Sequence, residues 1–292
     1  MGLKETVIRD MEEAERGSAL RRQGIYACSG LPTGFEALDR KLVGLHKGEL
    51  ILMSARPGMG KTTFAMAIAV HVALEEKVPV LYLSLAEKKE KDFNLYLSHK
   101  TDIDFEKVYS GDLKDEENEM IKKESDRIAG SPLLIDDDYK NLDDSLVPEV
   151  CSRCRKVKQR YGVGLIVLDY FQMLHYDSGS WETRQADRCR TVKELRNLAE
   201  ELDLPIVVVA QHPRDCEYRE DLRPHLKDFR RWGFPEQDWD AVLFLYRDHY
   251  YHREEEDSGE MEIIVAKNRH GSLGTVYIEW HQFDTNNPLP VR

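Results

Sequence analysis

Short apolar runs alternate along the chain with longer segments of mixed polarity. Runs rich in Val, Ile and Leu lie at residues 49–54, 78–84, 164–169, 204–210, 239–245, 261–266 and 275–280. Most of them are nearly continuous in apolar residues, a pattern typical of strands that are buried on both faces. Helical patterns separate these runs, beginning with one from Lys61. We therefore predict an α/β fold with a mostly parallel central sheet covered by helices on both faces.

The two ends of the chain carry different patterns. Among many charges, residues 5–22 place apolar side chains at Val7, Ile8, Met11 and Ala14. This spacing predicts a short amphipathic helix. Turn residues follow between Ser29 and Gly34, so we predict a helical appendage at 1–28 and a core domain at 29–292. The last two apolar runs are separated by a glycine-containing turn, which predicts a C-terminal β-hairpin.

The strongest chemical signal is the loop between the first predicted strand and the following helix. It reads Ala55-Arg56-Pro57-Gly58-Met59-Gly60-Lys61-Thr62 and is followed by Thr63. In such a loop, backbone N–H groups surround phosphates, the lysine contacts the β- and γ-phosphates, and the threonine hydroxyl binds Mg²⁺. We therefore predict ATP and Mg²⁺ as cofactors, bound by residues 55–63. Ala55 stands where glycine is usual, and alanine is small enough to fit.

Polar residues at the ends of other predicted strands are candidates for the rest of this site. Asp169 directly follows the run 165–168 and is predicted to hold Mg²⁺ together with Thr62. An acidic residue at this place can also stabilise a turn. Gln211 ends another strand, where its amide either contacts the γ-phosphate and reports to the following loop or has only a structural role.

Two further regions bear on hydrolysis. The run 80–84 leads into Leu85-Ala86-Glu87, close to the place where a group that orients the attacking water is expected. Lys267 and Arg269 lie at the predicted terminal hairpin. An arginine there serves either as a finger for ATP or in a surface salt bridge.

Composition limits the class of protein. The 292 residues are 41% hydrophobic and 33% charged, and no apolar run of 18 residues occurs, so we expect one large domain without a membrane span. The N-terminus lacks the apolar stretch of a signal peptide, so a soluble cytoplasmic protein is expected. The net charge of −12 means that any contact with nucleic acid must be a local patch or channel.

One segment offers such a patch. Between two predicted core strands lie the basic residues Arg214, Arg219, Arg223, Lys227, Arg230 and Arg231, with Phe229 and Trp232 interleaved. Basic groups with aromatic side chains suit the backbone and bases of a single strand of nucleic acid. Five acidic residues in the same segment nearly cancel this charge, so the segment alone leaves the question open.

Taken in order, the motifs resemble the C-terminal ATPase domain of DnaB-family replicative helicases. The similar segments are residues 30–39, 55–62, 165–174, 236–238, 244–248 and 266–271. The resemblance implies a RecA-like P-loop core and head-to-tail assembly into a hexameric homo-oligomer, with ATP between subunits and single-stranded DNA in the centre. It also implies that residues 1–28 are a linker helix packed on the adjacent subunit. Loader or primase proteins are implied partners.

The family's roles map onto particular residues of this sequence. Lys61, Thr62 and Asp169 would act in one subunit, while Gln211 would couple the nucleotide state to the DNA loops. Lys267 and Arg269 would reach the γ-phosphate bound by the neighbouring subunit. The DNA-contacting residues implied by the resemblance are Arg184, Arg230, Arg231, Trp232 and Gly233, and Arg214 of the basic segment is added to them as a candidate.

Three departures from the family pattern bear on function. The large N-terminal domain that typical members use for loader and primase contacts is absent from this sequence, as in a truncated, minimal phage or diverged member. Arg231-Trp232 replaces the acidic and small residues usual after the family's arginine. The family's Ser-Leu-Glu, whose glutamate activates water, reads Ser84-Leu85-Ala86 here. Either Glu87 takes over, or hydrolysis is impaired, or the alanine was introduced to trap ATP.

Three functions follow from this pattern. The first is an ATP-dependent helicase motor that moves on single-stranded DNA in replication. The second is a ring or clamp that binds ATP and DNA without hydrolysis, as Ala86 suggests. The third is another RecA-like ATPase, such as a recombination protein.

Overall fold

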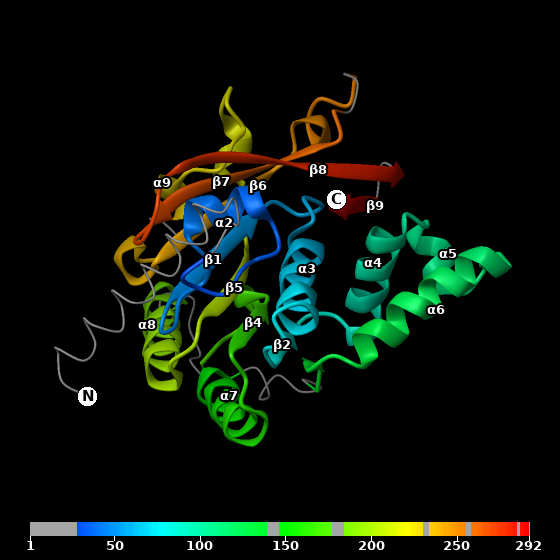
Figure 1. Cartoon of the computed structure of the whole chain (residues 1–292). Coiled ribbons are helices and arrows are strands. Elements are labelled where there is room, and N and C mark those ends of the chain that lie inside the picture. Colours follow the sequence, from blue (N-terminus) through cyan, green and yellow to red (C-terminus); the bar gives the residue numbers. More distant parts are fainter. Residues whose placement is uncertain are drawn as a thin grey trace, which may run out of the picture.

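The computed structural model describes residues 28–138, 146–176, 184–229, 234–254, 258–284 and 287–291 (Figure 1). The helices are α2 (Glu36–Leu42), α3 (Lys61–Leu74), α4 (Lys89–Thr101), α5 (Phe105–Ser110), α6 (Asp115–Ala129), α7 (Val147–Tyr161), α8 (Arg184–Leu202) and α9 (Leu226–Phe229). The strands are β1 (Leu50–Ala55), β2 (Val80–Ser84), β3 (Leu133–Asp136), β4 (Leu165–Asp169), β5 (Ile206–Gln211), β6 (Ala241–Tyr246), β7 (Glu260–Asn268), β8 (Gly274–Asp284) and β9 (Asn287–Val291). Short 3-10 turns are η2 (Phe171–Met173), η4 (Arg214–Tyr218), η6 (Glu236–Asp238) and η7 (Asp248–Tyr250). The predicted helix within 1–28 lies outside the described residues.

The strands form one mixed sheet in the order β3-β2-β4-β5-β1-β6-β7-β8-β9. Strands β3, β2, β4, β5, β1 and β6 are parallel, as their registers show. Strand β7 pairs antiparallel with both β6 and β8. The predicted mostly parallel sheet and the C-terminal hairpin are thus confirmed, while β3 and β9 were not predicted.

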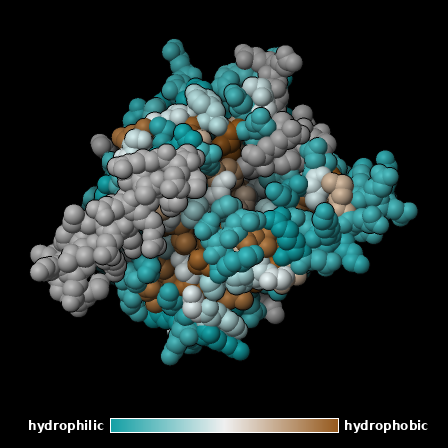
Figure 2. All heavy atoms as spheres, in the orientation of Figure 1, coloured by the Kyte–Doolittle hydropathy of each residue, from teal (hydrophilic) through white to brown (hydrophobic). Residues whose placement is uncertain are grey.

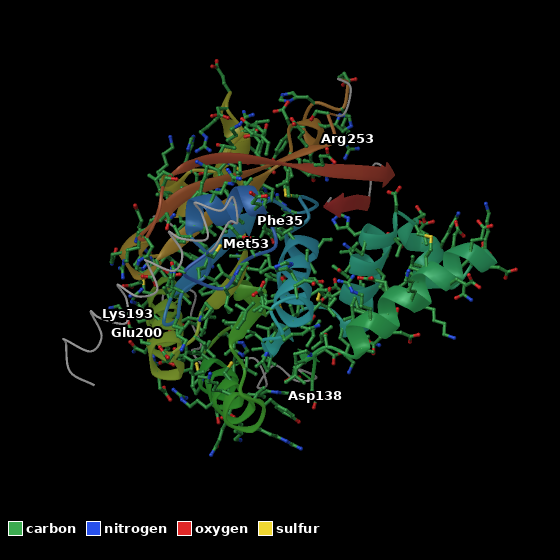
Figure 3. All side chains as sticks on the ribbon, in the orientation of Figure 1. Phe35, Met53, Asp138, Lys193, Glu200 and Arg253 are labelled. Carbon is green, nitrogen blue, oxygen red and sulfur yellow. The ribbon has the colours of Figure 1, made fainter. Side chains whose placement is uncertain are left out.

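Alternate side chains of each central strand point to opposite faces of the sheet and pack into two separate apolar cores. On β1, Ile51 and Met53 pack into one core with α3, whereas Leu50 and Leu52 pack into the other with α7 and α8. This division explains the continuous apolar runs, because a strand covered on both faces has no solvent side. In Figure 3, Met53 lies within the molecule, whereas the exposed Lys193 and Glu200 of α8 lie toward its outside.

Helices α4, α5 and α6 form an arm beside α3, and α4 also lies against β9 (Figure 1). Asp104 begins α5 by accepting hydrogen bonds from the backbone N–H groups of Glu106 and Lys107. The Glu117 carboxylate accepts one from the backbone of Lys114 at the start of α6. On the face shown in Figure 2 the arm is predominantly hydrophilic. The arm matters for the site because the first turn of α4 reaches the carboxyl edge of the sheet.

Candidate functional site

The carboxyl ends of four parallel strands bring the predicted site residues together. Ala55 at the end of β1 pairs with Gln211 at the end of β5, and Ser84 of β2 pairs with Asp169 of β4. Ligand sites in open α/β sheets form at this edge, because the loops that leave parallel strands converge there. The segment after β1 is therefore placed beside Asp169 and Gln211.

The loop from Ala55 to Lys61 has the backbone shape of a phosphate cradle. Gly58 and Gly60 have φ angles of 76° and 87°, which side chains with a Cβ adopt only with strain. Gly60 is the N-cap of α3 and provides no side-chain cap, so the first N–H groups of the helix are available to an anion. The Lys61 ammonium donates to the Arg56 carbonyl over 3.1 Å. Burial lowers the pKa of Lys61 to about 8, an effect that the Asp169 carboxylate opposes.

Thr62 and Asp169 supply the oxygen ligands that Mg²⁺ prefers. The Asp169 carboxylate accepts a hydrogen bond from the Tyr82 hydroxyl (2.7 Å) and another from the Thr62 side chain. Burial raises the pKa of Asp169, and these two hydrogen bonds oppose that shift. Among the described residues no group of three His, Cys, Asp or Glu side chains is arranged to hold a metal. A hydroxyl beside one carboxylate nevertheless fits Mg²⁺, which takes its remaining ligands from phosphate and water.

Two adjoining cavities lie over this edge. The larger, of about 360 Å³, is lined by Pro57, Lys61, Thr62, Ser84, Ala86, Glu87, Asp92, Asp169, Tyr170, Met173 and Gln211. The smaller, of about 280 Å³, shares Lys61, Thr62, Glu87 and Asp92 with it and extends toward α4 and Phe105. The structure thus places the predicted residues Lys61, Asp169 and Gln211 around one space.

The position of the expected water-activating carboxylate is occupied by an exposed Ala86. Glu87 also lines the cavities, but its side chain is 51% exposed and forms an ion pair with Lys91 over 2.9 Å. Its backbone carbonyl accepts a hydrogen bond from Ser84. The role predicted for Glu87 therefore competes with a local ion pair on the surface of α4.

Asp92 was not among the predicted residues, yet it lies in both cavities. It sits in the first turn of α4 and is only 4% exposed. The Ser84 hydroxyl donates to its Oδ2 atom over 2.5 Å. Burial raises the pKa of Asp92 to about 7, helped by the charges of Asp169 and Glu87 and opposed by the hydrogen bond from Ser84. In the sequence, Asp92 is distinguished only by its position among other polar residues at the start of a helix.

Hydrogen bonds with a neighbouring side chain hold the backbone of Gln211 in place. The Gln172 side chain donates to the Gln211 carbonyl (2.9 Å) and accepts from its N–H (3.1 Å). The Arg56 guanidinium of the loop donates to the carbonyl of His212, the next residue. These contacts connect the loop, η2 and β5 at the same edge, and they leave the Gln211 side chain facing the cavity.

Lys267 and Arg269 lie at the opposite edge of the sheet. Asn268 pairs with Ala241, and Ala241 pairs with Ile51 near the beginning of β1. The Lys267 ammonium donates to the carbonyls of Glu236 and Trp239, and Arg269 pairs with buried Asp240 over 2.7 Å. Four residue steps of about 3.3 Å separate Ile51 from Ala55, so this register position lies roughly 13 Å before the loop begins. The two cations therefore do not approach the Lys61 cavity of their own chain.

The predicted DNA-contacting residues are only partly covered by the structure. Arg230, Arg231, Trp232 and Gly233 lie outside the described residues, as does the side chain of Arg184. Arg214 is exposed on η4, just after β5. The neighbouring basic residues are engaged locally, since Arg219 pairs with Asp228 and Arg223 pairs with Glu262. These two arginines of the described part of the segment are therefore engaged by carboxylates of the same chain.

Known proteins share both the sequence and the fold. The DnaB-like helicase C-terminal domain family matches residues 30–286. Replicative DNA helicase DnaC of Bacillus subtilis (strain 168) is 37% identical over 248 residues, and replicative DNA helicase DnaB of Geobacillus stearothermophilus is 36% identical over 250. The matches cover 85% and 86% of this chain but 54% of each relative, so the chain spans about half their length. In the described part of the chain, no helix has the length and apolar character needed to cross a membrane.

Solved structures agree with this assignment. One solved ATPase domain gives a TM-score of 0.85 at 28% identity, covering 100% of this chain and 99% of that one. A structure of a DnaB-like replicative helicase and its interactions with primase gives a TM-score of 0.82 at 28% identity. That match covers 100% of this chain and 67% of the other. The predicted RecA-like fold is confirmed, and the chain belongs to the family of DnaB-like helicase C-terminal domains.

Proposed function

We propose that this chain is the ATP-hydrolysing motor domain of a DnaB-like DNA helicase that works as a hexameric ring on single-stranded DNA. The observation that carries the proposal is the division of its charged groups between the two edges of the sheet. Lys61, Thr62 and Asp169 line a cavity at the carboxyl edge, whereas Lys267 and Arg269 lie at the opposite edge. A head-to-tail interface would bring the second set onto the first.

In this assembly each side chain has a separate task. The N–H groups of the loop and of α3 would surround the β- and γ-phosphates of ATP, with Lys61 neutralising part of their charge. Thr62 and Asp169 would hold Mg²⁺, which supplies charge stabilisation between the phosphates. Arg269 and Lys267 of the adjacent subunit would stabilise the negative charge that spreads over the γ-phosphoryl oxygens during transfer.

Gln211 would connect the nucleotide to DNA. Its backbone is fixed by Gln172 and its side chain lines the cavity, so a γ-phosphate contact would be transmitted to the residues that follow β5. Those residues include exposed Arg214 and lead to 230–233, which we assign to a DNA-contacting loop together with the region around Arg184. A primase is the candidate protein partner, by similarity to the DnaB-like helicase solved with primase interactions.

The test is steady-state ATP hydrolysis with and without single-stranded DNA, alongside unwinding of a forked duplex and the mass of the ATP-bound assembly. We expect DNA-stimulated turnover by a six-membered species, and loss of turnover in Lys61→Ala. Normal nucleotide binding without turnover in this chain would favour the second candidate, a ring that binds ATP and DNA without hydrolysis. Ala86 is the observation that favours that candidate.

A further inference from the structure

ATP hydrolysis in a P-loop site uses a group that orients the attacking water, and a carboxylate at that place can also accept its proton. The methyl group of Ala86 does neither. Glu87 is next in the chain, but its carboxylate points into the ion pair with Lys91 and is half exposed. The loop after β2 therefore supplies no buried carboxylate of its own among residues 84–88.

Asp92 provides a buried carboxylate in the same space. Both cavities include Asp92 together with Lys61 and Thr62, so its side chain lies at their junction. It comes from the first turn of α4, the helix that follows the Ala86 loop directly. A carboxylate that is 4% exposed and lines a cavity is sheltered from bulk solvent yet accessible to a water inside.

Two hydroxyl groups of strand β2 donate hydrogen bonds to two carboxylates of the site. Tyr82 and Ser84 are two residues apart on one strand and so point to the same face of the sheet. The Tyr82 hydroxyl donates to Asp169, and the Ser84 hydroxyl donates to Asp92. These two hydrogen bonds hold Asp92 beside the carboxylate assigned to Mg²⁺. The two carboxylates have different tasks, since Asp169 also accepts a hydrogen bond from the Thr62 side chain.

One oxygen of Asp92 remains available. Within the described residues its carboxylate accepts one hydrogen bond, from Ser84 to Oδ2, so Oδ1 is open to a water in the cavity. The other acidic groups differ in this respect: Asp169 is engaged by Tyr82 and Thr62, and Glu87 by Lys91. Asp92 alone among these three combines burial, a fixed orientation and an open acceptor.

We propose that Asp92 is the catalytic carboxylate that orients the attacking water in place of the family glutamate missing at Ala86. This inference rests on the proposed ATPase function. The water oxygen forms a bond to Pγ while the bond from Pγ to the β,γ-bridging oxygen breaks, and ADP leaves with that electron pair. The proton of the water passes to the Asp92 carboxylate, which later returns it to solvent.

The decisive variant is Asp92→Asn, which keeps the size and the Ser84 hydrogen bond but removes the proton acceptor. We expect the kcat for DNA-stimulated ATP hydrolysis to fall about 10²–10⁴-fold, the usual range for a lost acid–base group. The affinity for a non-hydrolysable ATP analogue should stay within about twofold, since Lys61 and the loop bind the phosphates. Glu90→Gln is the matched control, because Glu90 is exposed in the same helical turn and loses the same charge.

Two further measurements separate catalysis from folding. Asp92→Asn should lose affinity for ADP with Mg²⁺ and aluminium fluoride, which mimics the planar phosphoryl group with its attacking water, while ATP-analogue affinity is retained. Adding Ala86→Glu to Asp92→Asn should restore turnover by returning a carboxylate to the cavity. An Asp92→Asn enzyme as fast as the unchanged chain would overturn the role of Asp92 and leave the ATPase proposal standing. Equal losses for both nucleotide complexes would also overturn it, in favour of a binding role.

The proposed function fails in a different way. If the unchanged chain binds ATP but never hydrolyses it, both the motor proposal and the role of Asp92 are wrong. Loss of turnover in Glu87→Gln but not in Asp92→Asn would assign the water to Glu87 instead and leave the motor proposal intact.

Discussion

His212 joins three parts of the molecule at the end of β5. Its Nε2 atom donates to Asp228 over 3.0 Å, and its Nδ1 atom accepts from the Ser54 hydroxyl over 3.4 Å. Its ring meets those of Phe229 and Phe244 edge-on. Burial lowers the pKa of His212 to about 4, against the effect of the Asp228 carboxylate. The imidazole is therefore neutral in the folded protein, and the Arg219 guanidinium balances the Asp228 charge.

The neutral state of His212 makes its contribution to stability depend on pH. Its folded pKa lies below the value of about 6.5 in the unfolded chain, so its contribution is complete above pH 6.5 and is lost as the pH falls toward 4. By pH 5 this loss amounts to ~2 kcal/mol, taking about 1.4 kcal/mol for each unit. His212→Gln should consequently destabilise the protein less at pH 5 than at pH 7.5, as measured by urea unfolding.

The effect of His212 is obtained from the difference in unfolding free energy between the unchanged chain and His212→Gln. The raised pKa of Asp92 acts in the opposite sense, because its stabilising effect grows as the pH falls from about 7 toward its unfolded value. Asp92 is present in both proteins and cancels. An equal effect of His212→Gln at both pH values would show that His212 is not held neutral.

Residues within a contiguous motif could be predicted from sequence, whereas Asp92 could not. The loop 55–62 indicates its chemistry because spacing, strand and helix coincide in one stretch. Asp92 becomes buried only because the turn after β2 folds α4 back over the carboxyl edge, where Ser84 meets it. Glu87 is a candidate from sequence because it adjoins Ala86, whereas the contact between Asp92 and Ser84 depends on how α4 folds back.

At the scale of single elements, complete burial made the central strands recognisable from sequence. Strands β1, β2, β4, β5 and β6 are buried at essentially every position, so their apolar runs are unbroken. Strand β3 has four residues, each only partly buried, at the edge of the sheet. Such a short segment after a long polar helix lacks a periodic signal, since tertiary pairing rather than local preference makes it a strand.

The difference between central and edge strands predicts different costs for the same substitution. Leu168 of β4 and Leu134 of β3 pack against one apolar core, but Leu168 is fully buried and Leu134 only partly. Leu168→Ala should lower the free energy of unfolding by about 2–5 kcal/mol through lost burial and an unfilled cavity. Leu134→Ala should cost about 1 kcal/mol, because solvent and movement of an edge strand fill its space. Equal losses in urea unfolding would contradict this view of the sheet.

The turn between β7 and β8 is docked on the end of α2. The Lys41 carbonyl accepts hydrogen bonds from the Asn268 side chain (2.8 Å) and the Ser272 backbone (3.3 Å). A Cβ on Gly271 would lie 1.9 Å from that carbonyl oxygen. Gly271→Ala should therefore push the turn off α2 and cost about 1–3 kcal/mol of stability, the usual range for overpacking.

The matched control for this change is Ser272→Ala, since Ser272 is exposed and bonds to Lys41 through its backbone. We expect Ser272→Ala to unfold at the same urea concentration as the unchanged chain. Because Arg269 lies on the same turn, Gly271→Ala should also lower ATP turnover more than nucleotide affinity. A variant with unchanged stability would mean that the turn is not held against α2.

The whole molecule presents different chemistry at the two edges of its sheet, an asymmetry that the proposed head-to-tail ring would use. Asp240 is buried at the edge opposite the cavity and pairs with both Arg269 and Arg196. Arg269 is nearly half exposed, so its guanidinium is accessible to the phosphate of a neighbouring subunit in the proposed ring. Replacing Arg269 should leave the fold intact, because Arg196 still neutralises Asp240.

Mixing two inactive variants tests whether the finger acts between subunits. Lys61→Ala removes the lysine proposed to bind the phosphates, and Arg269→Ala removes the proposed finger, so each variant alone should hydrolyse ATP poorly. In a closed head-to-tail ring of randomly mixed equal amounts, about a quarter of the interfaces combine an intact Lys61 with an intact Arg269. DNA-stimulated turnover should therefore reappear on mixing. Lys61→Ala mixed with the double variant should stay inactive, since no interface contains an intact Lys61. If Arg269 served its own chain, the first mixture would stay as inactive as its components, and the ring arrangement of the site would be wrong.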